Sequence, residues 1–150
     1  MQRAALTSAL CYRDPKAALK FLEAAFGFEL TMLIEDNEGN LAHSEMGFGD
    51  SLIMIGNEWT DRHKSPASIE GFNTQSVHIH LEGDIDAHCA RARAAGAEIL
   101  MEPADQFYGD RTYRCRDPEG HFWTVGAPIR AVGVEEAEAA SGLKVVKGWA

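Results

Sequence analysis

Hydrophobic and polar residues follow two different spacings along the first third of the chain. A spacing of two puts successive side chains on opposite faces of a strand, whereas spacings of three and four gather them on one helix face. Strands are predicted at residues 6–12, 29–35, 41–46 and 51–55. Between the first two strands a helix begins after Asp14-Pro15 and ends at Gly27. The apolar face of that helix consists of Ala18, Leu19, Leu22, Ala25 and Phe26.

The second half of the chain repeats this order. Its predicted strands and helix lie at residues 76–81, 84–95 (the helix), 97–101, 112–116 and 121–125. The segment FGFEL at 26–30 matches AGAEI at 95–99, and IMIG at 53–56 matches WTVG at 123–126. This internal repeat predicts an α+β fold of two βαβββ modules. Each module is too small to bury both faces of its sheet, so the two should pair, with helices on the outer faces and a shared cleft suited to a small molecule.

The predicted organisation has four parts. Residues 1–56 form the first module, 57–75 a linker without periodicity, 76–127 the second module, and 128–150 a C-terminal helix and docking tail. The helix of the tail is acidic and is expected at 134–140. The last ten residues include Leu143, Val145, Val146 and Trp149 and are too apolar for a free end, so they are expected to dock on this subunit or on a partner.

The bulk composition narrows the function classes. The formal net charge of -9, from 14 basic and 23 acidic residues, argues against nucleic acid or an anionic membrane surface as a partner. Cys11, Cys89 and Cys115 are too few and too scattered for a disulfide framework and fit a reducing compartment. The first ten residues lack the apolar core of a signal peptide, and no run approaches the ~18 apolar residues of a membrane span. A cytoplasmic location is therefore predicted.

The stretch at residues 108–127 reads as strand, tight turn and strand, with its turn at the sequence DPEG. Its segments YGDR at 108–111 and DPEGHFW at 117–123, with Asp14 and the helix end FGFE at 26–29, resemble the vicinal oxygen chelate superfamily. Within that superfamily the chain looks most like the glyoxalase/bleomycin-resistance proteins. The resemblance implies the paired-module fold and a homodimer that buries open sheet edges. It does not imply a reaction, because the family includes isomerases, dioxygenases, epimerases, antibiotic-hydrolysing enzymes and pure drug binders.

Metal enzymes of this superfamily hold one divalent ion with His, Gln and Glu side chains from the first and last strands of each module. The positions that correspond to these ligands here are Thr7, Met54, Ser76 and Thr124. Hydroxyls are weak ligands for such ions, and a thioether is softer than they prefer. We therefore predict that the standard chelate is lost, that no cofactor is bound, and that these four residues line a ligand site instead.

The strand at 76–81 carries two histidines on one face. Alternation puts His78 and His80 on the face opposite the aliphatic residues, which should pack on the helices. Three interpretations stay open for this pair: general acid/base or substrate hydrogen bonding, a displaced metal site with Glu45 or His43, or a solvated sheet face.

Other residues also have two interpretations. Arg111 could clamp a carboxylate or phosphate of a ligand, or hold its turn through Asp110 or Asp117. Cys11 and Cys115 could be thiolates activated by a neighbouring arginine, or small buried residues. A set of aromatic residues could form a wall that stacks on a planar ligand, or belong to an ordinary core: Trp59, Phe107, Tyr108 and Phe122.

The leading prediction is metal-independent binding of a small organic molecule by stacking and a few hydrogen bonds. The contacts expected for this function are His78, His80, Thr124, Phe122 and Tyr108. The alternative is a metal-dependent enzyme with an atypical site, similar to lactoylglutathione lyase or to the dioxygenases. A third possibility is a partner-binding protein, for which the apolar tail is the only support. Whether the chain catalyses a reaction stays open.

Overall fold

The computed structural model describes residues 4–148 as two four-stranded sheets with three α-helices and one short 3-10 helix. The elements in chain order are β1 (Ser8–Tyr12), α1 (Pro15–Phe26), β2 (Glu29–Glu35), β3 (Leu41–Phe48), β4 (Ser51–Asn57), η1 (Pro66–Ser68), β5 (Ser76–His80), α2 (Ile85–Ala94), β6 (Glu98–Asp105), β7 (Asp110–Arg116), β8 (Phe122–Pro128) and α3 (Val134–Ser141).

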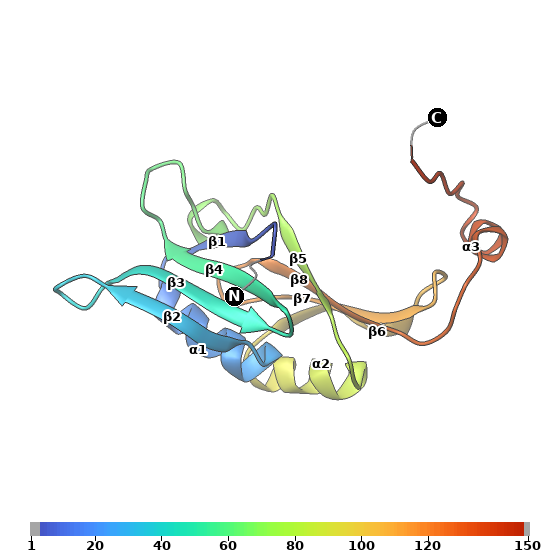
Figure 1. Cartoon of the computed structure of the whole chain (residues 1–150), viewed down its shortest axis with the longest axis horizontal. Coiled ribbons are helices and arrows are strands. Elements are labelled where there is room, and N and C mark those ends of the chain that lie inside the picture. The colour runs from blue at the N-terminus through green and yellow to red at the C-terminus, as the bar shows by residue number, and fades with distance from the viewer. Residues whose placement is uncertain (1–3, 149–150) are drawn as a thin grey trace.

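The two sheets have the same topology. The strand order is β1-β4-β3-β2 in the first and β5-β8-β7-β6 in the second. In each sheet the first strand runs parallel to the last, and the other pairs are antiparallel. The α+β fold with two βαβββ modules is therefore confirmed (Figure 1).

Strand β6 is longer than the alternation predicts. The expected strand ends at Met101, but β6 continues through Pro103 to Asp105. Proline is tolerated there because β6 is an edge strand and its pairing with β7 is irregular between Met101 and Ala104. Pro103 has no N–H to donate, but it lies within this irregular stretch, so no hydrogen bond of the regular ladder is lost.

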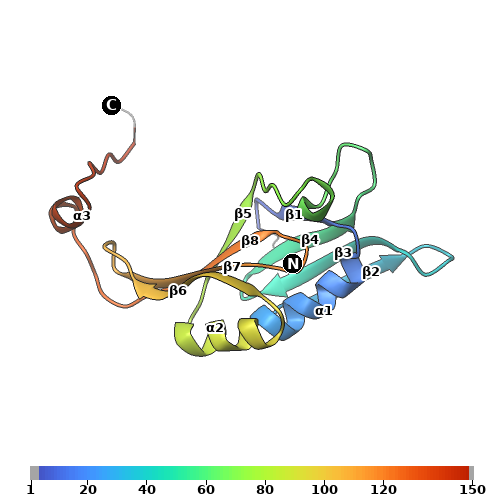
Figure 2. The same cartoon turned by 180° about the vertical axis from the view of Figure 1, so that it is seen from behind.

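Helix α1 forms where its capping signals place it. The Asp14 side chain accepts a hydrogen bond of 3.1 Å from the Ala17 N–H, and Gly27 takes the left-handed conformation with φ 84°. Helices α1 and α2 pack against each other on one side of the two sheets (Figures 1 and 2). The sequence pattern did not predict this contact between the two helices.

One hydrophobic core joins the modules. Trp123 of β8 is fully buried, and its ring centroid lies 5.0 Å from that of Phe26 and 5.8 Å from that of Phe28. On α2, the buried His88 pairs with Tyr113 and with the Phe26 carbonyl oxygen. Aromatic side chains at the end of α1 thus reach into the second module, which explains why the two helices meet.

The C-terminal arm, residues 129–148, leaves the body after β8 (Figures 1 and 2). The acidic helix expected at 134–140 is present as α3, which makes no substantial packing contact with another element in the described part of the chain. The apolar residues left exposed along the arm are Ile129, Val134, Leu143, Val145 and Val146. Trp149, which was also expected to dock, lies outside the described residues. No described helix is long and apolar enough to cross a membrane.

Candidate functional site: a cleft between the two modules

Five of the predicted site residues share the open face of the second sheet. In the register of β5 with β8, Ser76 stands opposite Phe122 and His78 opposite Thr124, while His80 stands opposite Gly126. The intervening Ile79 is buried in the core, so alternation leaves the two histidines on the opposite face. The sequence pattern therefore predicted the direction of both imidazoles correctly.

The two imidazole rings stack on each other. Their centroids lie 4.6 Å apart with an interplanar angle of 25°. Gly126 leaves room for this arrangement, because a Cβ there would lie 3.3 Å from His78 Nε2. Partial burial lowers the pKa of His78 below its ordinary value. The neighbouring His80 and Arg114 lower this pKa further, whereas Asp110 raises it. His78 is thus a neutral imidazole near pH 7, with one nitrogen able to donate and one able to accept.

A cleft of about 870 Å³ lies between the modules, beside the unpaired edge of β5. Its first wall comes from Phe28 and the β3–β4 hairpin, and its second from residues 77–82. Most of the lining is apolar, and its polar side chains are those of Asp50, Ser51, His78, His80 and Glu82. The volume and this mixture of surfaces are typical of sites for small organic ligands.

Met54 lies in a different place, on the open face of the first sheet. It lines a cavity of about 370 Å³ together with Cys11, His43, Trp59 and His63. The rings of Trp59 and His63 stack with centroids 4.3 Å apart, and His43 Nε2 lies 3.3 Å from Glu45 Oε1. The exposed Thr7 immediately precedes β1 at the edge of the same sheet.

The residues at the four ligand positions of the superfamily do not fit a divalent metal. Met54 supplies only a thioether, and Thr7, Ser76 and Thr124 supply only hydroxyls. Elsewhere in residues 4–148, no three His, Cys, Asp or Glu side chains converge as a ligand set. The His43–Glu45 pair and the His78–His80 pair belong to separate sheets, so the chain alone does not assemble them around one ion.

Arg111 is engaged by two carboxylates of its own module. Its Nε and Nη2 donate to the Asp86 carboxylate, both at 2.9 Å, and its Nη1 donates to Asp105 Oδ1 at 2.8 Å. The partners are therefore different from the Asp110 and Asp117 considered from the sequence. This geometry ties α2 to the β6–β7 hairpin.

The four aromatic residues considered as a wall lie at three separate places. Trp59 belongs to the first-sheet cavity, and Phe122 to the open face of the second sheet. Phe107 and Tyr108 pack edge to face in the β6–β7 turn, with centroids 5.2 Å apart. Among the described residues, no aromatic contact links these places.

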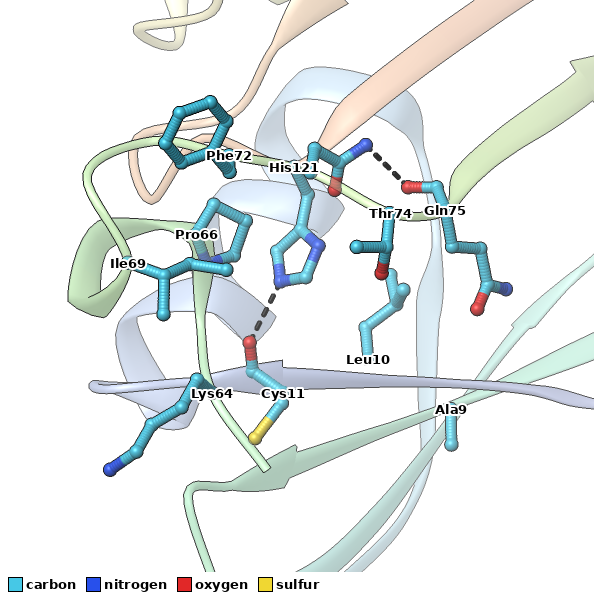
Figure 3. Close-up of a pocket in the computed structure, with 11 residues that line it drawn as sticks. Ala9, Leu10, Cys11, Lys64, Pro66, Ile69, Phe72, Thr74, Gln75 and His121 are labelled. Carbon is cyan, nitrogen blue, oxygen red and sulfur yellow. Dashed lines mark hydrogen bonds between the residues drawn. The ribbon is translucent and has the colours of Figure 1, made fainter. Parts of the chain in front are cut away.

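A third cavity, of about 120 Å³, lies between β1 and the linker (Figure 3). His121 points into it and donates from Nε2 to the Cys11 carbonyl oxygen at 2.7 Å. The Cys11 thiol donates to the Asn57 carbonyl oxygen at 3.0 Å, and burial together with Glu58 and Glu119 raises its pKa. Burial raises the pKa of the Cys115 thiol to about 12. Neither thiol has the environment of an activated nucleophile.

The apolar side of the intermodule cleft was not among the site residues predicted from the sequence. Phe28 and Phe48 pack with ring centroids 5.2 Å apart, next to Leu52 on β4. The signal that could have found them is the internal repeat. The β7–β8 turn packs on the end of β1 through His121 and Cys11, so the β3–β4 turn should lie near β5 in the same way.

Comparisons with known proteins agree with this architecture. The family model described as Glyoxalase/Bleomycin resistance protein/Dioxygenase superfamily matches residues 5–125. The uncharacterized protein Mb0911c of Mycobacterium bovis is 31% identical over 141 residues, which cover 91% of both chains. TioX from Micromonospora sp. ML1 is 28% identical, with a TM-score of 0.65 over 84% of this chain and 99% of TioX. TnmS3, an antibiotic binding protein from Streptomyces sp. CB03234, shares the fold at 20% identity, with a TM-score of 0.64 over 84% of this chain and 99% of its own.

Proposed function

The chain belongs to the glyoxalase/bleomycin resistance protein/dioxygenase superfamily, and from this premise we propose that it binds a small organic molecule in the cleft between its modules. The proposed binding does not use the metal chelate of the superfamily. One observation carries this proposal: two histidines line a mostly apolar cleft of about 870 Å³, while the four chelate positions hold no carboxylate or imidazole.

The chemistry of the cleft supports a largely apolar ligand with a few polar groups. Phe28, Phe48 and Leu52 offer dispersion contacts and burial. A neutral His78 can donate one hydrogen bond and accept another, and His80 stacks on it. TnmS3, a structural neighbour, is described as an antibiotic binding protein, and that description is consistent with sequestration of an antibiotic-like compound or metabolite here.

The other residues predicted to contact the ligand differ in how close they lie to the two histidines. Ser76, Phe122 and Thr124 share the sheet face of the histidines and would meet a ligand that extends over it. Thr7, Met54 and Tyr108 lie at other places in the protomer and would need a second subunit to join the same ligand. Arg111 forms ion pairs with Asp86 and Asp105, which favours a role in holding the fold over a role in binding a ligand.

An enzyme with an atypical metal site is the alternative. The His43–Glu45 pair supports it, because an imidazole and a carboxylate lie 3.3 Å apart on the same face of the first sheet as Met54. A second subunit that brought its own His78 and His80 to this pair would complete a plausible ligand set. This alternative keeps the lyase and dioxygenase chemistries of the superfamily open.

Metal content and ligand binding separate the two functions. The chain, purified without a His tag or a chelator, is analysed for divalent metals by mass spectrometry before and after metal soaking. We expect metal content near zero, and saturable binding of a hydrophobic aromatic antibiotic from a screened set by calorimetry. The variant His78→Gln/His80→Gln should bind more weakly, while the control His63→Gln should not. One equivalent of bound metal that both histidine substitutions abolish would overturn the proposal in favour of the enzyme.

We also propose that the chain is a homodimer in a reducing cytoplasm. Strand β2 is an exposed edge whose apolar residues Leu30, Met32, Leu33 and Ile34 are all 37% exposed or more. A second subunit would cover such a surface. The three free thiols support a reducing compartment, and the net charge of -9 supports neither nucleic acid nor an anionic membrane as a partner.

A further inference from the structure

The linker after β4 and the arm after β8 occupy equivalent places in the internal repeat. Leu10 of β1 pairs with Ile55 of β4, and Ile79 of β5 pairs with Val125 of β8. The second module therefore follows the first by about 70 residues, and residues 58–75 correspond to the arm. Both segments contain a helical element, η1 in the linker and α3 in the arm, followed by an extended stretch.

In the first module the linker covers the outer edge of β1. It crosses that edge with Pro66, Ile69 and Phe72 and leaves a cavity of only about 120 Å³ (Figure 3). The Gln75 side chain donates to Ser8 Oγ at 3.1 Å, which fixes the end of the linker beside the strand. The outer edge of β1 is thus closed by its own connecting segment.

The equivalent edge in the second module is uncovered. Strand β5 hydrogen-bonds to β8 alone among the described strands, and the cleft of about 870 Å³ lies along its other edge. The arm that corresponds to the covering linker extends away from the body (Figures 1 and 2). Within residues 4–148, the apolar cleft has no cover, and the apolar arm makes no substantial packing contact with another helix or strand.

The arm and the cleft are complementary in chemistry. Residues 143–147, LKVVK, contain three apolar residues of which two are valines, and such a segment favours an extended strand. They carry Lys144 and Lys147 but no acid, whereas the cleft lining carries Asp50 and Glu82 but neither lysine nor arginine. The segment matches the five residues of β5 in length, as a strand that adds to an open edge requires.

The arm begins at a close backbone contact between Gly109 and residues 129–130, which we call the elbow. The N–H groups of Ile129 and Arg130 both donate to the Gly109 carbonyl oxygen, at 2.8 and 3.1 Å. Gly109 has φ 99°, and a Cβ there would lie 2.3 Å from the Arg130 carbonyl oxygen. Backbone contact at this point sets the direction in which the arm leaves the body.

We propose that two copies of the chain exchange C-terminal arms, and that the arm of each copy covers the β5 edge and closes the cleft of the other. The exchange is reciprocal and generates a closed two-fold dimer. The inference deepens the proposed function, because it names the lid of the ligand cleft, but the arm contact itself requires no ligand. His78 and His80 then lie beneath a wall that the partner supplies.

Mixing of two full-length variants tests this exchange. The arm variant carries Leu143→Asp and Val146→Asp, whose wild-type side chains are 64% and 67% exposed within one chain. The cleft variant carries Leu52→Asp. The control Leu6→Asp changes a still more exposed apolar residue ahead of β1, 90% exposed. Assembly is measured by sedimentation equilibrium without ligand, and folding of every variant by near-ultraviolet circular dichroism.

We expect a wild-type dimer that the control retains. Each apolar residue removed from the contact should weaken the dimer about tenfold or more. A mixture of the arm and cleft variants should recover dimers, because one intact arm then meets one intact cleft. A wild-type monomer, a dimer insensitive to both variants, or a mixture that behaves as its separate components would each overturn the proposal. A failure of ligand binding alone would leave it intact, since the measurement contains no ligand.

Discussion

Tyr12 Oη donates a hydrogen bond of 2.5 Å to Asp117 Oδ2, which connects the end of β1 to the β7–β8 turn of the other module. The same carboxylate accepts from Trp123 Nε1 at 3.1 Å and from the His121 N–H at 3.0 Å. Burial and the neighbouring Asp117 raise the pKa of Tyr12 well above its ordinary value, so the phenol is a donor at neutral pH. One buried acid therefore shapes its own turn and links the two modules.

Replacing Tyr12 by Phe should destabilise the fold without altering the cleft. The change removes one of the two side-chain hydrogen bonds to the buried Asp117 Oδ2, and we expect the free energy of unfolding to fall by about 1–3 kcal/mol in urea titrations. The matched control is Tyr108→Phe, because the Tyr108 side chain is exposed and its loss should cost about 0.5 kcal/mol or less. Equal losses for the two variants would contradict the role of this hydrogen bond.

His88 should make the fold sensitive to mild acid. Its Nε2 lies 3.1 Å from the Phe26 carbonyl oxygen, which can only accept, so Nε2 carries the proton and Nδ1 accepts from Tyr113 Oη at 2.7 Å. Burial lowers the pKa of His88, and Arg91 adds to this, so the unfolded chain binds a proton at a higher pH than the folded chain does. Stability is then full above the ordinary imidazole pKa of about 6.5 and declines as the pH falls below it.

The measurement is the free energy of unfolding in urea between about pH 7 and pH 5. The variant His88→Gln should have a shallower loss of stability toward acid pH than the wild type. His78, whose pKa is lowered as well, should account for part of the remaining slope, and His78→Gln should remove that part. A wild-type stability that rises toward pH 5 would reverse the sign and refute this explanation.

The three thiols should differ in reactivity toward a disulfide reagent. Cys89 and Cys115 are buried, whereas Cys11 is partly exposed. The raised pKa of Cys11 keeps its thiolate scarce, so we expect one slowly reacting thiol per folded chain and three fast ones in denaturant. The substitution Cys11→Ser should remove the slow phase, while Cys89→Ser should leave it. Rapid reaction of Cys11 in the folded chain would contradict its inert environment.

Replacing Arg111 by Lys should affect stability and not ligand affinity. A lysine cannot reproduce the two bonds to Asp86 together with the third to Asp105. We expect a lower melting temperature and an unchanged dissociation constant for any ligand of the cleft. As a control, Arg93→Lys changes a more exposed arginine that pairs with one carboxylate among the described residues, that of Glu102, and should shift the melting temperature less. A marked loss of affinity in Arg111→Lys would restore the role of an anion clamp.

The fold was predictable because local and global signals in this chain agree. The Asp14-Pro15 start, the Gly27 stop and the alternation around His78 each have a purely local cause, and each appears where it was predicted. Strand β6 exceeded its prediction because pairing irregularities at an edge accommodate Pro103, and no local pattern encodes such irregularities. The meeting of α1 and α2 depends on which module the rings of Phe26 and Phe28 enter, which is a property of the assembled core.

The candidate site was predictable only in part, for the same reason. Alternation is enough to orient side chains on one strand, so Ser76, His78 and His80 were placed correctly relative to Thr124. The partners of Arg111 come from α2 and from the end of β6, and sequence distance gives no hint of them. The cleft wall formed by Phe48 and Leu52 arises from the packing of one module beside the other.

The elbow at Gly109 leads to the last prediction. Substitution by Ala puts a Cβ 2.3 Å from the Arg130 carbonyl oxygen, and because both groups are backbone, the arm must leave the body in another direction. If the exchanged arm covers the partner's β5 edge, Gly109→Ala should weaken the dimer in sedimentation equilibrium by about tenfold or more, as the loss of one or more buried apolar contacts would.

The control for this substitution is Gly39→Ala in the β2–β3 hairpin. Gly39 has φ 81°, so alanine suffers the same left-handed strain, but the nearest atom to its Cβ would be Glu35 Oε2 at 4.0 Å. The strain alone should cost about 1–2 kcal/mol of folding stability at either position. Only the clash at Gly109 redirects the arm, so only Gly109→Ala should loosen the dimer. Equal effects on the dimer would mean that the elbow does not aim the arm, and the exchange would then have to depend on contacts made after the arm has left the body.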